Sequence, residues 1–167
     1  MNDVAGAGTI GGDTLMGKMF ASMSLVDGAH MTAQNSGASG QLLSDMVDAV
    51  YTTAYSFVRL QARKRICILW CPSNDLDDSI SAATVWANLQ TLVRRLRATF
   101  YDVVLVLPLL PRTSINLNYE ADRASVNGNI TNNIAAAGGI AVDIFAGSAS
   151  VLNNPTIILD TTYYFID

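Results

Sequence analysis

The sequence is poor in the residues that bind soft metals or form disulfides. One histidine and two cysteines occur among its 167 residues, whereas a structural zinc site takes about four Cys or His ligands. Cys67 and Cys71 fall in one predicted strand, which separates their Cα atoms by about 13 Å. A disulfide requires less than roughly 7 Å. We therefore expect two free thiols, no metal and no cofactor.

Long hydrophobic runs and an excess of positive charge are also missing. The apolar runs are shorter than the roughly 20 residues that span a membrane, and no basic segment followed by an apolar stretch opens the chain. The net charge is −4, which disfavours a nucleic-acid partner. Two basic clusters, Arg59–Arg65 and Arg94–Arg97, fall in or just past the last turn of predicted helices, where cations complement the helix dipole.

Half of the residues are hydrophobic, and their spacing alternates between two patterns. Short continuous apolar runs predict strands, and apolar residues recurring at three and four positions predict amphipathic helices. Residues 1–12 are rich in glycine and barely patterned, and an acidic group (Asp75, Asp77 and Asp78) is predicted to open the second helix. The strands are predicted at 30–35, 66–71, 102–107 and 139–145, and the helices at 43–58, 85–96 and 124–137.

This alternation predicts one α/β domain over residues 1–167. Strands that alternate with helices form parallel βαβ units, and continuous apolar strands indicate a sheet covered on both faces. We therefore predict a three-layer α/β/α sandwich with a mostly parallel, flavodoxin-like central sheet. Ligands bind outside the carboxyl ends of the strands in such a sheet. The turns after residues 35, 71 and 107 share that edge, and Asn74 lies in one of them.

Four short motifs occur along this scaffold: Gly12–Leu15, Asn35–Gly40, Pro72–Asp75 and a late Asp167. In this order, they resemble the motifs of the SGNH (GDSL-like) hydrolase family, and the resemblance spans essentially the whole chain. The Pro72–Asp75 segment is similar to the family's Gly-x-Asn-Asp block, and residues 35–143 match best.

The resemblance implies a role for one residue in each motif. The hydroxyl of Thr14 would attack an ester carbonyl, activated by a histidine that Asp167 orients. The backbone N–H of Gly40 and the side-chain amide of Asn74 would stabilise the oxyanion that forms. Read without the resemblance, Gly40 is a turn glycine, Asn74 is a helix-entry residue, and Thr14 or Asp13 caps a helix.

Two positions depart from the family pattern. Thr14 replaces the usual serine and adds a methyl group beside the path of attack. The last block is Asp-x-x-His, but the given sequence stops at Asp167, and His30 is predicted at the opposite edge of the sheet. The histidine would follow Asp167 in a longer parent protein, or come from a neighbouring subunit of an oligomer, or be missing from an inactive relative.

Three functions follow from these observations. The first is hydrolysis of an acyl or acetyl ester, carried by a small molecule or a carbohydrate. The second is a catalytically inactive binding or structural module, for example a viral or surface-assembly component, because the low charge suits burial in an oligomer. The third is a flavodoxin-like nucleotide-binding protein. Its glycine motifs, Gly6–Gly11 and Gly12–Lys18, lack the preceding strand that such motifs need.

Overall fold

The computed structural model describes residues 40–53, 64–70, 73–99, 101–111 and 116–143. The chain divides after Gly40, and every helix and strand described below belongs to the unit that begins at Gln41. Thr14, His30, Cys71 and Asp167 lie outside the described residues, as does the strand predicted at 30–35.

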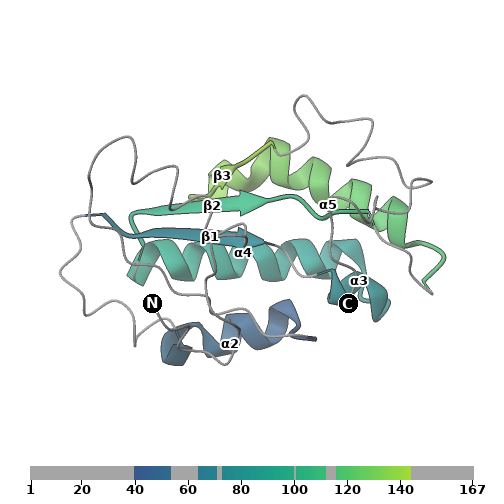
Figure 1. Cartoon of the computed structure of the whole chain (residues 1–167), viewed down its shortest axis with the longest axis horizontal. Helices are drawn as coiled ribbons and strands as arrows, with labels where there is room; N and C mark the ends of the chain where they lie inside the picture. Colours follow the sequence, from purple (N-terminus) through teal and green to yellow (C-terminus); the bar gives the residue numbers. More distant parts are fainter. Residues whose placement is uncertain (1–39, 54–63, 71–72, 100, 112–115, 144–167) are drawn as a thin grey trace, which may run out of the picture. The chain divides into compact units, whose positions relative to one another are not determined.

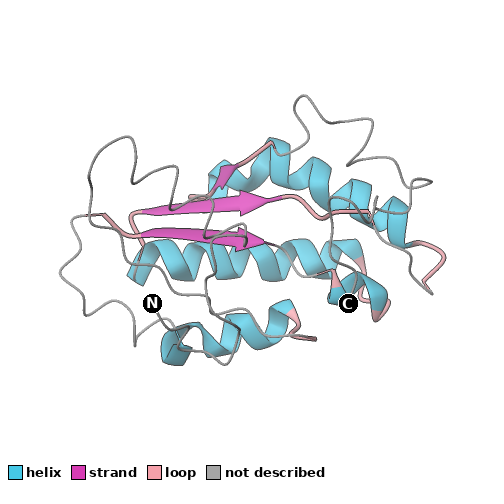
Figure 2. Cartoon of the chain, viewed as in Figure 1, coloured by secondary structure: helices cyan, strands magenta, loops and turns pink. Residues whose placement is uncertain are grey.

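The sheet is parallel and has the strand order β1-β2-β3 (Figures 1 and 2). The strands are β1 (Ile66–Trp70), β2 (Val103–Leu107) and β3 (Ile140–Ala141). In the register of the sheet, Ile66 pairs with Val103, and Leu105 pairs with Ile140. The strands predicted near these positions are confirmed.

The predicted amphipathic helices are also confirmed, with different bounds for the second and third; the predicted end of the first, residues 54–58, lies outside the described residues. The helices are α2 (Leu43–Thr53), α3 (Asn74–Asp77), α4 (Ala82–Thr99) and α5 (Tyr119–Asn133), and a 3₁₀ helix, η1 (Ile134–Ala137), continues α5. Gly138 follows η1 with φ of 85°, a left-handed conformation that glycine adopts without strain. The next strand, β3, begins two residues later.

The predicted start of the second long helix is wrong. Asp75 and Asp77 lie in the first turn of the separate short helix α3, not at the start of α4. Helix α4 instead begins after Ser81, whose Oγ accepts a hydrogen bond from the Thr84 N–H at 3.2 Å. A serine at this position satisfies a helical N–H that has no partner within the helix.

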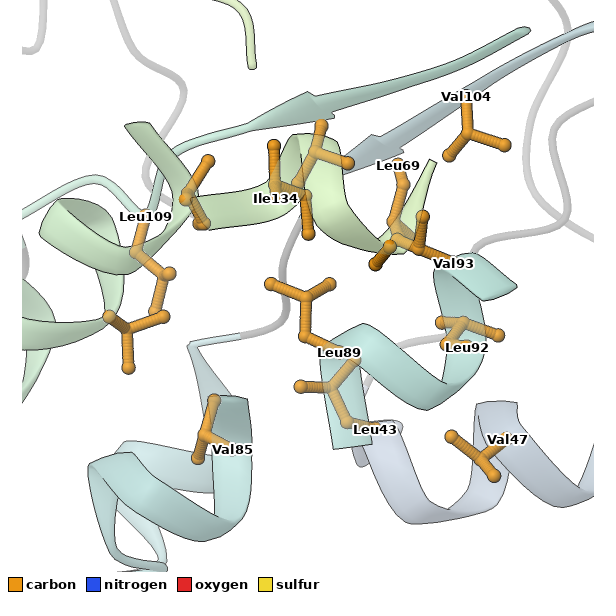
Figure 3. Packing of buried hydrophobic residues seen from close by; sticks show 14 of the residues in the cluster. Leu43, Val47, Leu69, Val85, Leu89, Leu92, Val93, Val104, Leu109 and Ile134 are labelled. Atoms are coloured by element: carbon orange, nitrogen blue, oxygen red, sulfur yellow. The ribbon is translucent and has the colours of Figure 1, made fainter. Parts of the chain in front are cut away.

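The hydrophobic core forms between α4, the sheet and the flanking helices (Figure 3). Leu89, Leu92 and Val93 of α4 lie at its centre; Leu43 and Val47 enter from α2. Burial of each such aliphatic side chain stabilises the folded state by about 1.5–3 kcal/mol relative to an exposed one. The stripe predicted on the second helix is buried along its whole length: Val85, Leu89, Leu92, Val93 and Leu96.

The two faces of the sheet differ in exposure. Leu69, Val104 and Val106 lie in the core between the sheet and α4 and are buried. On the other face, Ile66, Trp70 and Ile140 are 47%, 44% and 54% exposed. The structure therefore confirms an α/β fold with a parallel sheet. A helical layer over the exposed face is not among the elements in the described ranges.

Three arginines of the two basic clusters have partners in the structure, whereas Arg59 and Arg63 lie outside the described residues. The Arg95 side chain on α4 donates to the Val47 carbonyl of α2. Arg97, in the last turn of α4, donates to the carbonyl of Tyr101 at 3.0 Å and to that of Asp102. Arg65 forms an ion pair with Asp102 at 3.4 Å.

Among the helices of the described ranges, none is long and apolar enough to cross a membrane.

Candidate functional site

Asn74 is held by one of its two amide N–H groups. It opens α3 just after β1, and its Nδ2 donates to the Gln41 carbonyl at 3.2 Å. An asparagine amide carries two N–H donors. Within the described part of the chain, no second hydrogen bond from this side chain is found, and the residue is only partly buried. The amide is therefore fixed in orientation while one N–H remains for another acceptor.

The carboxylate of Asp75 accepts a hydrogen bond from the first residue of α2, Leu43. Its Oδ1 and Oδ2 accept the Leu43 N–H at 3.2 and 3.0 Å, and the residue is fully buried. Leu43 is the first residue of α2, so its N–H has no partner within the helix. Burial raises the pKa of Asp75, and the hydrogen bond from Leu43 opposes that rise. Asn74 and Asp75 thus tie the loop after β1 to residues 41–43.

Gly40 directly precedes this segment in the chain. Its φ is +72°, a left-handed conformation that strains most residues with a side chain. A Cβ built on Gly40 would meet no atom within 4 Å, so the space beside its backbone is open. The backbone conformation, and not crowding, is what favours glycine here.

The loop after β2 is held by polar side chains of α5. Asn127 accepts the Leu109 N–H at 2.8 Å and donates to the Leu109 carbonyl at 2.9 Å. Arg123 donates to the same carbonyl at 3.3 Å, and Tyr119 Oη donates to the carbonyl of Leu110. Buried backbone groups need such partners, and the result is a loop fixed at the carboxyl edge of the sheet.

Asn116 extends this arrangement to the loop after β1. It lies just before α5, and its Nδ2 donates to the Leu76 carbonyl of α3 at 2.6 Å. Helix α3 and the loop after β2 are therefore both bound to α5 or to its entry. The sequence analysis assigns no role to Arg123 and Asn127. The signal in the sequence is their spacing of four, which places two polar residues on one side of a helix.

A hollow of about 470 Å³ opens between α5 and the ends of β2 and β3. Its wall combines apolar and hydrogen-bonding side chains. It lies at the ends of the strands where parallel sheets bind their ligands. Its lining includes Pro108, Arg123, Asn127, Thr131, Val142 and Asp143.

Cys67 is a partly buried thiol in β1, and it is free as predicted. Burial raises its pKa to about 11. A thiol with that pKa stays protonated near neutral pH, and only the thiolate is a good nucleophile. Cys67 is therefore a packing residue.

In the described ranges, no three His, Cys, Asp or Glu residues are grouped so that they could hold a metal ion.

Of the four residues expected to act in catalysis, the structure describes Gly40 and Asn74; Thr14 and Asp167 lie outside the described residues. Comparison of the chain with models of known families, with curated proteins and with solved structures finds no match. The resemblance to SGNH hydrolases therefore depends on the order and placement of its motifs.

Proposed function

We propose that the protein is an SGNH-like hydrolase that cleaves an acyl or acetyl ester of a small molecule or a carbohydrate. The observation that supports this function is the anchored amide of Asn74 at the carboxyl edge of a parallel sheet. One N–H binds the Gln41 carbonyl. The other is the donor that would meet the oxyanion.

Anchoring matters because an oxyanion donor works best when it is oriented before the reaction begins. An amide that rotated freely would have to be ordered as charge develops. The bond to Gln41 removes that rotation. Gly40, one residue earlier, would supply a second donor from its backbone N–H, and its open, left-handed backbone leaves room for a substrate.

The proposed reaction is an acyl transfer through the enzyme. Thr14 Oγ attacks the ester carbonyl while its proton passes to a histidine, and Gly40 and Asn74 stabilise the tetrahedral oxyanion. The histidine then protonates the leaving alcohol as the ester C–O bond breaks. Water releases the acyl group from Thr14, and Asp167 orients the histidine throughout. That histidine would lie beyond Asp167 in the parent protein or come from a neighbouring subunit.

We also propose the complete three-layer sandwich with a flavodoxin-like sheet. Ile66, Trp70 and Ile140 leave an apolar sheet face about half exposed. Exposed apolar surfaces of this kind usually mark a contact with another element or partner. A second layer of helices from the same chain would bury these side chains.

Turnover of p-nitrophenyl acetate by the parent protein tests the hydrolase. We expect Asn74→Ala to lower kcat by about 100- to 1,000-fold, as loss of one oxyanion donor does elsewhere. The lost bond to Gln41 should reduce the free energy of unfolding by only about 1 kcal/mol. Asn132→Ala, at an exposed position on α5, is the matched control and should leave kcat unchanged. Absence of turnover by the unaltered parent protein would exclude the hydrolase.

A non-catalytic assembly module is the second candidate, and the same exposed sheet face favours it. If that face binds another subunit, Trp70→Lys should dissociate an oligomer and leave the subunit folded. If a layer of the same chain covers the face, Trp70→Lys should lower the melting temperature without changing the mass in solution. Light scattering together with thermal unfolding separates the two outcomes.

A further inference from the structure

Neighbouring side chains on α3 hold the start of α2 with opposite polarity. Asn74 donates a hydrogen bond to the Gln41 carbonyl, and Asp75 accepts one from the Leu43 N–H. The two contacts fall on consecutive peptide groups, 41–42 and 42–43. A slip of this segment by one residue would change which carbonyl faces the donor and which N–H faces the acceptor. The contacts therefore fix the register of residues 41–43 against α3, and not merely their proximity.

A buried carboxylate is a costly way to satisfy one helix N–H. Asp75 is fully buried and lies 32 positions from Leu43 in the sequence, and burying a carboxylate carries a large desolvation penalty. A nearby residue can satisfy such an N–H at the surface, as Asp45 does for the Leu42 N–H at 3.3 Å. Capping of α2 alone does not require Asp75, because a residue close in the sequence could do it. A contact that fixes the start of α2 against α3 does require a residue of α3 such as Asp75.

We propose that Asp75 is a positioning residue of the oxyanion site: it holds residues 41–43 in register with Asn74, so that the Gln41 carbonyl orients the Asn74 amide. This inference rests on the proposed function. Asp75 does not touch the substrate, since its carboxylate is buried against the Leu43 N–H. It acts through residues 41–43 at the start of α2.

The expected effect follows from the precision that catalysis needs. A misplacement of about 1 Å in a catalytic group can lower the rate by about 100-fold. Asp75→Ala removes both acceptors of the Leu43 N–H and frees the start of α2. Asp75→Asn keeps one carbonyl oxygen of the same size, so it retains a weaker acceptor at the same place. The two variants therefore form a graded pair.

The test combines kinetics with an NMR measurement that does not depend on activity. In the parent protein, we expect kcat for p-nitrophenyl acetate to fall about 100-fold in Asp75→Ala and about 10-fold in Asp75→Asn, with KM within about threefold. The ¹H–¹⁵N signals of the Asn74 side-chain amide and of the Leu43 N–H should shift in both variants. Asn132→Ala, the exposed position on α5 used as a control above, should alter neither reading.

Failure of this inference can be distinguished from failure of the proposed function. Folded Asp75 variants with unchanged kcat and unchanged Asn74 signals would overturn the positioning role. If the unaltered protein shows no turnover, the hydrolase fails, and the NMR signals alone decide: shifted Asn74 signals support positioning, and unchanged ones refute it. If Asp75→Ala does not fold, Asp75→Asn gives the answer by the same readings.

Discussion

Asn127 offers the sharpest test of how the loop after β2 is fixed. Its amide binds both backbone groups of Leu109, a fully buried residue. In Asn127→Ala the Leu109 carbonyl keeps its bond from Arg123, but the Leu109 N–H loses the acceptor that Asn127 provides. Leaving a buried donor without a partner costs about 1–3 kcal/mol.

Helix propensity offsets part of that loss. Alanine is more favourable than asparagine inside a helix by about 0.6 kcal/mol, so we expect a net loss of about 1–2 kcal/mol in the free energy of unfolding. For a chain of this length, that corresponds to a fall in the melting temperature of about 2–8 °C. Asn127→Asp keeps an acceptor but turns a carboxylate oxygen toward the Leu109 carbonyl, so at pH 7 it should be no more stable than the alanine variant.

Urea unfolding followed by circular dichroism measures these differences, provided that the slope with denaturant is the same in all variants. Asn132→Ala is the control, because the Asn132 amide lies at an exposed site on α5 and binds the local Gly128 carbonyl. It should change the free energy of unfolding by less than about 0.5 kcal/mol. Equal stability of Asn127→Ala and this control would refute the role assigned to Asn127.

Three further predictions concern the core and the titrating groups. Leu89→Ala should reduce the free energy of unfolding by about 2–5 kcal/mol in the same assay, because Leu89 is fully buried, and an effect below 1 kcal/mol would contradict the core. In a Cys71→Ser background, iodoacetamide at pH 8 should label Cys67 slowly in the folded protein and quickly in urea, because burial raises its pKa to about 11; equal rates would count against this burial. The Arg65 backbone N–H and guanidinium hold the pKa of Asp102 below its ordinary value of 3.8, so its contribution to stability is present above that pH and is lost as the pH falls through the lowered pKa. Asp102→Asn should accordingly be less stable than the unaltered protein at pH 7, and a difference that persisted unchanged at the acid end of a pH series of urea titrations would argue against the pairing with Arg65.

The site depends on the contacts of four side chains that no single motif contains. Asn74 and Asp75 bind the start of α2, Asn116 binds α3, and Asn127 holds the loop after β2. Polar groups that are held by their own hydrogen bonds keep a site ordered before any ligand arrives. This is the physical link between the packing of α5 and the chemistry proposed at Asn74.

The amino-acid sequence by itself determined the class of fold and the long helices and strands that the structure describes, but not the short helix α3. The repeat of Val85, Leu89 and Leu96 specifies one face of a helix wherever that helix docks, and the continuous apolar runs at 66–71 and 102–107 specify strands. These signals are local, since they depend only on the spacing of neighbouring residues. The sequence also placed Asn74 just after a strand, where a ligand site was expected.

Only the tertiary structure decided which partners the polar residues take. The sequence pattern predicts that Asp75 opens α4, whereas its carboxylate accepts the N–H of Leu43, 32 positions away. Asn127 likewise binds Leu109 because α5 packs beside the loop after β2. A side chain's propensity is set by its neighbours in the sequence, but its hydrogen-bond partner is set by how the helices dock. The docking is a property of the whole core.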